Sequence, residues 1–520
     1  MGTVESVRPR RARPPFEAVR HFLPWCYVAD DSLNYSFFLE DLMTVQASKR
    51  RRFLGHAALA LAAPAIPTGA WAQTVLQRRL EWQSFKSTPQ YASLLTGIRR
   101  MKANTNPADA RSWTYWTNIH LNACPHSIPY FLAWHRGYLY YFERQLRAAS
   151  GDTRLVLPYW DYYSYATLPA EFTNASSTNP LYVARRNTNV RQALTLAPFS
   201  STLINFERGQ ANAFEPSLES APHNPVHDII GGVMATMQSP VDPIFWLHHA
   251  NVDRLWVAWV GAGGGRRMPA KTSLYWSGIH TYTGALAMQR RSTYDTRTNL
   301  LYFYQNETMP TTVPLARKST GEVFRVQARP NDTPASSAPF GAFRGTGPRS
   351  TGDSTFSIGG ALAIGLDQRS ISAHLPVSSE HWSAVQEIMR GNPASIPGSA
   401  KKFKSVQLVL DEVELAEEGR QGGYFYRVYL NFPSQDGAPG QQNSLLLGTL
   451  GAFQIHGASH HGSKARLRYP IPGALLRNPA LRLGMASVSF VRVDGDNSPR
   501  GATLGIGEAR LELSTEDKGS

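Results

Sequence analysis

The spacing of hydrophobic residues changes along the chain and separates a helical part from a strand-rich part. In residues 134–149 the positions of one predicted helical face are His135, Leu139, Phe142 and Leu146. Charged residues occupy the opposite face, as in an amphipathic helix. Residues 222–231 and 248–260 are also predicted helices. The first begins at Pro222 and ends at Gly231, and the second is followed by Gly261.

The C-terminal part has a different pattern of short alternating runs separated by turns. Residues 405–410, 424–430 and 486–491 are such runs. Their spacing predicts an antiparallel β-sandwich-like domain over residues 356–516. Residues 306–355 are rich in Pro, Ser, Thr, Gly and Arg, which predicts a linker or loops.

The N-terminal region carries a pattern typical of an export signal. The basic run 49–52 precedes an apolar run over 57–66, and Ala70-Trp71-Ala72 supplies small residues before a cleavage site. This resembles a twin-arginine signal, so we expect an exported protein without residues 1–72. Met43 is then a candidate start. The alternative is a basic loop followed by a core helix.

Composition narrows the classes of function. The chain has 520 residues, 42% of them hydrophobic, which suits folded domains with sizeable cores. Its formal charge of +15 comes from scattered basic residues rather than a stripe, so nucleic acid is not an expected partner. The apolar run near the N-terminus is too short to span a bilayer, and we expect no membrane-spanning segment.

Two groups of histidines predict two metal ions. His223 and His227 are four residues apart, so a helix would present both rings on one face, and a third imidazole from another helix would complete the ligand set. The other group, nearer the N-terminus, is His120, His126 and His135. Imidazole donors suit copper, zinc, nickel or iron rather than magnesium or calcium. A zinc hydrolase needs a carboxylate beside its first ligand, where this chain has Asn224, so that reading is disfavoured.

These motifs resemble those of the type-3 copper proteins: tyrosinases, catechol oxidases and hemocyanins. The resemblance covers about residues 113–305 and includes Asp242-Pro243-Ile244-Phe245 and Tyr302-Phe303-Tyr304. It implies a catalytic domain over 73–305, mainly α, in which a four-helix bundle holds two copper ions that react with O2. The implied ligands are His120, His126 and His135 for the first copper, and His223, His227 and His249 for the second. Family spacing favours His249 over its neighbour His248.

The resemblance also suggests roles for four other residues. Cys124 matches the position of a cysteine that forms a thioether, here to His126; the alternative is a small buried hydrophobic residue. Glu219 and Asn224 would hold a water that deprotonates the phenol, although Glu219 could instead compensate a helix dipole. Thr236, thirteen residues before His249, stands where some relatives place phenylalanine over the copper.

From these features we expect a tyrosinase that hydroxylates monophenols and oxidises the resulting o-diphenols to o-quinones. The alternatives are a catechol or o-aminophenol oxidase and an oxygen carrier, the last disfavoured by the lack of an internal repeat. The expected partners are small phenols and export machinery; the oligomeric state is left open. The C-terminal domain could cover the copper cleft through Tyr424, Phe425 and Tyr426, or merely stabilise the catalytic domain. A last histidine group, His456, His460 and His461, is either an extra metal site or a solvated loop.

Overall fold

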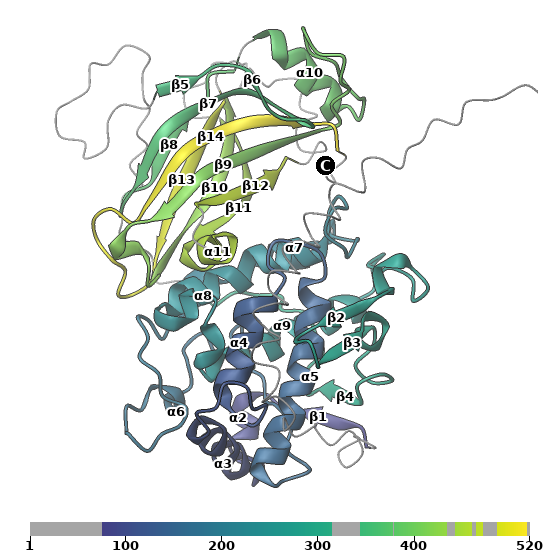
Figure 1. Cartoon of the computed structure of the whole chain (residues 1–520), viewed down its shortest axis with the longest axis vertical. Coiled ribbons are helices and arrows are strands. Elements are labelled where there is room, and N and C mark those ends of the chain that lie inside the picture. Colours follow the sequence, from purple (N-terminus) through teal and green to yellow (C-terminus); the bar gives the residue numbers. More distant parts are fainter. Residues whose placement is uncertain are drawn as a thin grey trace, which may run out of the picture. The chain divides into compact units, whose positions relative to one another are not determined.

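Helices dominate the first part of the computed structural model and strands the second (Figure 1). The structure describes residues 75–314, 344–377, 379–433, 442–459, 464–471 and 486–516. The described residues belong to one compact unit, Ala65–Ser520. The predicted signal, with the basic run and Met43, lies outside the described residues. Among the helices that are described, none combines the length and apolarity needed to cross a bilayer.

The helical part is built on long helices with short strands at its margin. Its helices are α2 (Trp82–Phe85), α3 (Gln90–Ala103), α4 (Trp113–Ala123), α5 (Phe131–Ser150), α6 (Ala170–Thr173), α7 (Phe214–Leu218), α8 (Asn224–Ile230) and α9 (Ile244–Gly261). Its strands are β1 (Gln77–Arg79), β2 (Ile279–Thr281), β3 (Ala287–Gln289) and β4 (Tyr302–Tyr304). Helix α5 packs against α3 and α9. These elements share one aromatic-rich core.

Helix boundaries follow local capping chemistry. The Ser112 side chain accepts a hydrogen bond from Tyr115 N and so caps α4. Gly151 has a φ of 79° and ends α5 in the left-handed conformation that glycine adopts without strain. The predicted helix 134–149 is therefore present and is longer, because three residues before Trp134 and Ser150 after it also turn helically.

Two predicted helices start at other residues in the structure. The helix expected from Pro222 begins at Asn224, because a π-helical turn, Glu219–His223, precedes it and Ala221 is non-helical within that turn. The helix expected from His248 begins at Ile244. There Asp242 Oδ1 accepts a hydrogen bond from Ile244 N at 3.0 Å, which satisfies a donor of the first turn.

In the described residues of the C-terminal part there are two antiparallel sheets and two helices. Its strands are β5 (Arg344–Thr346), β6 (Arg349–Gly352), β7 (Thr355–Leu366), β8 (Ile371–His374), β9 (Ser405–Leu415), β10 (Tyr424–Pro433), β11 (Gln442–Gly451), β12 (Ala465–Pro470), β13 (Ser487–Asp494) and β14 (Leu504–Ser514). Its helices are α10 (Ser379–Met389) and α11 (Ala452–Ala458). One sheet has the order β11-β10-β13-β8, and the other β12-β9-β14-β7-β5 with β6 also on β7.

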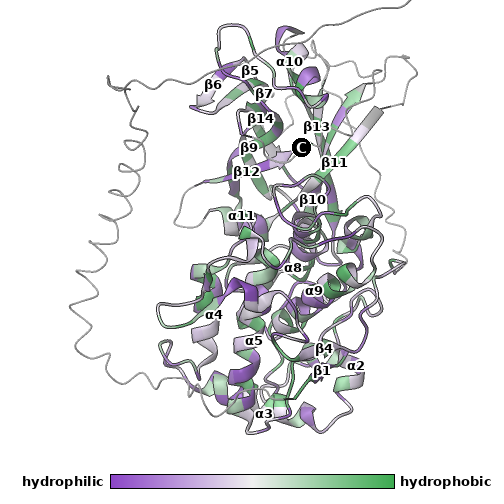
Figure 2. Cartoon of the chain, turned by 90° about the vertical axis from the view of Figure 1, so that its right-hand side faces the viewer, coloured by the Kyte–Doolittle hydropathy of each residue, from purple (hydrophilic) through white to green (hydrophobic). Residues whose placement is uncertain are grey.

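Both sheets contribute side chains to one hydrophobic cluster. Strand β12 shows how a strand buries one face: Ala465, Leu467 and Tyr469 are buried, while the residues between them are exposed. Figure 2 shows hydrophobic and hydrophilic residues mixed along the strands and helices, as expected for elements with one buried face. Strands β5 and β6 lie within residues 306–355, which were predicted to be a linker or loops, and only these two short segments and the start of β7 depart from that prediction in the described residues. The backbones of β5 and β6 pair with β7 despite a polar, glycine-containing sequence.

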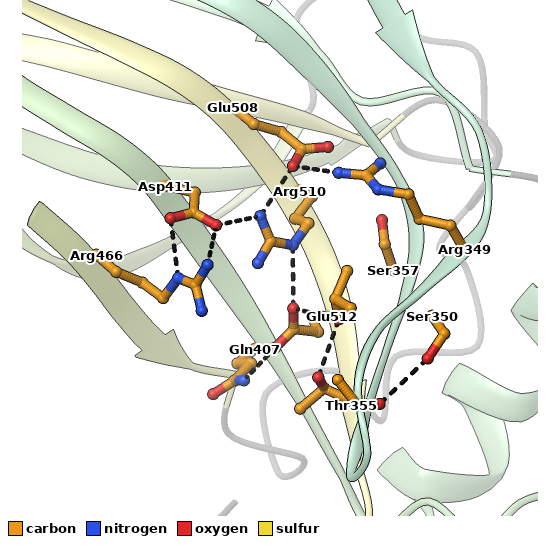
Figure 3. Close-up of polar contacts among 12 residues, drawn as sticks. Arg349, Ser350, Thr355, Ser357, Gln407, Asp411, Arg466, Glu508, Arg510 and Glu512 are labelled. Atoms are coloured by element: carbon orange, nitrogen blue, oxygen red, sulfur yellow. Dashed lines mark hydrogen bonds and ion pairs between the residues drawn. The ribbon is translucent and has the colours of Figure 1, made fainter. Parts of the chain in front are cut away.

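A network of charges covers the polar side of β14 (Figure 3). Arg510, 3% exposed, lies within 2.8 Å of Glu508, 2.9 Å of Asp411 and 3.0 Å of Glu512. Arg349 pairs with Glu508, and Arg466 with Asp411. Three arginines thus face three carboxylates, which compensates the charges at a buried surface where an unpaired charge would be costly.

Strands β10 and β11 and helix α11 pack against the helical part at α8. Gly423 N donates to Asp228 O at 2.7 Å, and Thr449 Oγ1 donates to Ser220 O at 2.6 Å. The approach is close at Gly451, where a Cβ would come within 2.0 Å of Asp228 Oδ2. Glycine at this position therefore lets the C-terminal part reach the helix that carries His227.

Candidate metal centre

The six predicted ligands come from four helices, one π-helical turn and one loop. His120 lies near the end of α4, His126 in the following loop, and His135 in the first half of α5. His223 ends the π-helical turn, His227 lies on α8, and His249 on α9. The structure brings them together in two groups: His120, Cys124, His126 and His135; and His223, His227, His248 and His249. Within each group the candidate ligand atoms lie within 4.8 Å of one another.

Backbone carbonyls hold three of these rings in a defined orientation. The Nδ1–H groups of His120, His135 and His227 donate to the carbonyl oxygens of Met237, Phe131 and Met234, each at 2.8 Å. A carbonyl only accepts, so the proton is on Nδ1 and the in-plane lone pair is on Nε2. This arrangement is typical of imidazoles that bind a metal through Nε2.

In the second group, the Nε2 atoms of three histidines lie close together. His249 Nε2 lies 3.4 Å from His223 Nε2 and 3.4 Å from His227 Nε2. His248 belongs to the same group and its ring stacks near His223, with centroids 5.2 Å apart. Within the described part of the chain, neither ring nitrogen of His248 has a hydrogen-bond partner. The choice of His249 over His248 stays a prediction.

Electrostatics keep these imidazoles neutral. Burial lowers the pKa of His223, His227 and His249 well below 6.5, and the neighbouring imidazoles lower it further. Neutral imidazole is the form that binds a metal. The clustered atoms of both groups are imidazole nitrogens and the Cys124 sulfur, without a carboxylate, which fits copper better than a hard cation.

Cys124 lies beside the first group. Its Sγ is 3.6 Å from His126 Nε2 and 3.3 Å from His135 Nε2. Burial raises the pKa of the Cys124 thiol well above its ordinary value, and Glu219 raises it further. The sulfur is thus close to two ligand rings, and the thioether to His126 stays a prediction.

Glu219 and Asn224 are the two residues predicted to deprotonate the phenol. Glu219 lies in the π-helical turn before α8, and Asn224 is the first residue of α8. Glu219 is buried; its Oε1 accepts from Ser127 N at 2.6 Å and its Oε2 forms an ion pair with Arg208. Asn224 Oδ1 accepts from His223 Nδ1 at 2.8 Å, so Asn224 orients a predicted ligand. Asn224 N also donates to the carbonyl of Glu219. The pair is therefore joined through the backbone, and its catalytic role stays a prediction.

Thr236 belongs to a segment that touches both histidine groups. Its neighbours Met234 and Met237 accept hydrogen bonds from His227 and His120 through their carbonyls. The Thr236 side chain is partly exposed and its Oγ1 donates to Val233 O at 2.9 Å. A larger side chain at position 236 would lie between the two residues whose carbonyls contact the histidine groups.

Phe453 of the C-terminal part packs its ring on the histidines, a contact that sequence reasoning missed. Its ring stacks on His227 at 3.9 Å with planes 12° apart, and meets His126 edge-on at 5.0 Å. The predicted cover of Tyr424, Phe425 and Tyr426 is wrong. On β10 the two tyrosines face the core of the sheets and Phe425 faces the helical core, because side chains alternate along a strand.

Helix α11 holds Phe453 in place through contacts with the helical part. Phe453 N donates to Asp228 Oδ1 at 2.8 Å, and His456 Nδ1 donates to Ala235 O at 2.8 Å. His456 thus has a structural contact, and the other two histidines of its predicted group, at positions 460 and 461, lie outside the described residues. No sequence pattern marks Phe453, since its position depends on how the two parts pack.

The comparison with known families decides the identity of the helical part. The common central domain of tyrosinase matches residues 95–205 and 173–262, which include all six predicted ligands. Residues 95–262 therefore match the central domain of the tyrosinase family. It is similar to tyrosinase HcTyr1 of Hahella sp. (strain CCB-MM4), with 36% identity over 28% of this chain and 39% of that protein. It is also similar to a tyrosinase of Streptomyces glaucescens, with 35% identity over 26% of this chain and 63% of that one.

The tyrosinase-family match spans less than two thirds of the length of these relatives. Among solved structures, latent apple tyrosinase aligns over 87% of this chain and 99% of its own, with 18% identity and a TM-score of 0.48. Tyrosinase-family proteins hold two coppers, and the two histidine groups provide one place for each.

Proposed function

We propose that the protein is a tyrosinase, which hydroxylates monophenols to o-diphenols and oxidises these to o-quinones with O2. The observation that carries this proposal is the pair of histidine groups within a tyrosinase-family domain. One copper would be held by His120, His126 and His135, and the other by His223, His227 and His249. When bound, the two coppers would supply the redox chemistry that passes electrons from the phenol to O2.

The surrounding residues would orient the substrate and move its proton. A monophenol has to lose its hydroxyl proton to bind as a phenolate, and Glu219 is a buried carboxylate in the π-helical turn directly before α8. Asn224 fixes His223 and meets the Glu219 backbone. The rings of Phe131 and Phe245 contact predicted ligands and would help to exclude water from the histidine groups. A small residue at Thr236 would leave room for a monophenol.

A catechol or o-aminophenol oxidase is the second candidate. The observation that favours it is the engagement of both Glu219 carboxylate oxygens, by Ser127 and Arg208. A carboxylate with two strong donors is a weaker proton acceptor than a free one.

The decisive assay uses purified protein reconstituted with copper. Tyrosine and a catechol are supplied separately, and quinone formation is followed by absorbance. We expect quinone from both. Quinone from the catechol alone would replace the tyrosinase proposal with the catechol oxidase, and a reversible oxygen adduct without turnover would point to an oxygen carrier.

We further propose that Phe453 shields the histidine groups from substrate. Phe453→Ala is expected to raise kcat/KM for a catechol about tenfold, since a cover that leaves about one molecule in ten open lowers the apparent affinity by that factor. The measurement is steady-state kinetics at equal copper loading.

Phe432→Ala is a matched control for this change. Phe432 is as buried as Phe453, at 2% against 1%, but it belongs to the core of the sheets. Either truncation costs about 3–5 kcal/mol of stability. Equal activation by both variants, or no activation by Phe453→Ala, would show that α11 does not shield the site.

Export through a twin-arginine signal is also a proposal, supported by the sequence of residues 49–72. Changing Arg50 and Arg51 together to lysine is expected to retain the protein in the cytoplasm. The exported wild-type protein should begin at or near Gln73, as N-terminal sequencing would determine. An exported chain that still carries residues 1–42 would contradict a start at Met43.

A further inference from the structure

The carboxylate of Glu219 is enclosed by donors on both of its oxygens. Ser127 N, in the loop directly after His126, donates to Oε1 at 2.6 Å. Arg208 supplies the guanidinium that pairs with Oε2. Glu219 is 2% exposed, so little water competes with either contact. Besides burial itself, two neighbours act on this carboxylate, and of these only Arg208 carries a charge.

Arg208 lies on a loop before α7 and faces two buried carboxylates. Its side chain is 25% exposed and pairs with Glu219. Its backbone N donates to Glu215 Oε2 at 3.2 Å. Glu215 Oε1 in turn accepts from Leu132 N and from Tyr275 OH. The two carboxylates thus connect the 127–132 segment to α7 and the π-helical turn, and Arg208 supplies the positive charge between them.

Glu219 pairs with the guanidinium of Arg208, whereas Glu215 accepts a hydrogen bond from the backbone N–H of Arg208. Burial raises the pKa of Glu215 to about 7, and Arg208 only partly opposes this. Burial also raises the pKa of Glu219, while both the charge of Arg208 and its hydrogen bond act in the opposite direction. Arg208 therefore stabilises the ionised form of Glu219 and weakens it as a base.

We propose that Arg208 determines substrate specificity: its ion pair with Glu219 limits transfer of the monophenol hydroxyl proton to that carboxylate, and so sets the ratio of monophenol to o-diphenol oxidation. In this step the phenol O–H bond breaks and a Glu219 O–H bond forms, without any change of oxidation state. The inference rests on the proposed function, because it assigns Glu219 to the monophenol. Arg208 is a positioning residue, since it acts through Glu219.

The first test compares Arg208→Gln and Arg208→Lys with the wild type. We expect Arg208→Gln to raise the tyrosine-to-catechol ratio of kcat/KM about tenfold on the alkaline plateau, because a charge within ion-pair distance shifts a carboxyl by at least about one pKa unit. The acid limb of the monophenol profile should move to higher pH. Arg208→Lys keeps the charge and should keep the wild-type ratio.

Arg266→Gln is the matched control. It removes the same charge from a guanidinium that donates to the backbone carbonyls of Phe199 and Gly263. We expect this variant to keep the wild-type ratio. A rise in Arg266→Gln equal to that in Arg208→Gln would assign the effect to net charge and overturn the proposal, as would a ratio in Arg208→Gln that does not change.

The second test needs no copper and no turnover. Infrared titration of copper-free protein with ¹³C-labelled glutamate reports carboxyl protonation, and subtraction of the Glu219→Gln spectrum identifies the Glu219 band. We expect this band to protonate at a pH at least about one unit higher in Arg208→Gln than in wild type. An unchanged titration would overturn the role of Arg208. If the wild type oxidised no phenol, the proposed function would fail while this titration would still decide the inference.

Discussion

His227→Ala is expected to bind one copper in place of two and to lose about 10³-fold or more in phenol oxidation. The Nε2 atom of His227 converges with that of His249, and its Nδ1–H is fixed by Met234 O. Alanine would remove one of three donors from the second site and leave a cavity under Phe453. A loss of about 4 kcal/mol of transition-state stabilisation corresponds to roughly 10³-fold in rate. Copper per chain and catechol turnover are the measurements.

His248→Ala provides the control for this prediction. His248 is as buried as His227 and lies in the same group, but it is not a predicted ligand. We expect His248→Ala to retain two coppers, while His249→Ala should behave like His227→Ala. If His248→Ala lost a copper and His249→Ala kept both, His248 would be the ligand in place of His249. A chain that holds one zinc and no copper would refute the dicopper centre.

Glu219→Gln is expected to reduce monophenol oxidation about 10²-fold, with a smaller effect on o-diphenol oxidation. Glutamine preserves the shape of the side chain and can still accept from Ser127 N, but it is not a base, and general-base catalysis typically contributes about 10²-fold or more. The measurement is kcat/KM for tyrosine and for a catechol on the same preparation.

Glu215→Gln separates this catalytic role from a structural one. Glu215 is also buried, lies four residues earlier and also accepts from the 127–132 segment. We expect Glu215→Gln to affect both substrates equally. Equal losses in Glu219→Gln would mean that Glu219 is a structural link between Ser127 and Arg208.

The sequence predicted the features that depend on local spacing. The clustering of His223 with His227 on one helical face, the helix around His135 and the alternating strands of the C-terminal part all reflect the periods of helix and strand. The start of α8 was misplaced because a π-helical turn disrupts the expected period before Asn224. Strands β5 and β6 were missed because their pairing with β7, rather than their composition, makes them strands.

The missed site features depend on packing between distant segments. Phe453 is 226 residues from His227 in sequence and reaches it only because α11 docks on α8. The ion pair between Arg208 and Glu219 joins a loop to a π-helical turn, and neither residue type is unusual at its position. Such contacts have no periodic signature, so hydrophobic patterning could not predict them.

His227 and Asp228 are adjacent on α8, so the second histidine group and the docking contact of α11 use neighbouring residues of one helix. His227 faces the second histidine group, while the next residue accepts the backbone N–H of Phe453. If copper binds more tightly to one placement of α11 than to another, α11 must favour that placement by the same factor when copper is bound. With such a difference, the affinity of the second site is a property of both parts of the chain, and a fragment that ends at Gln305 would have its own copper affinity.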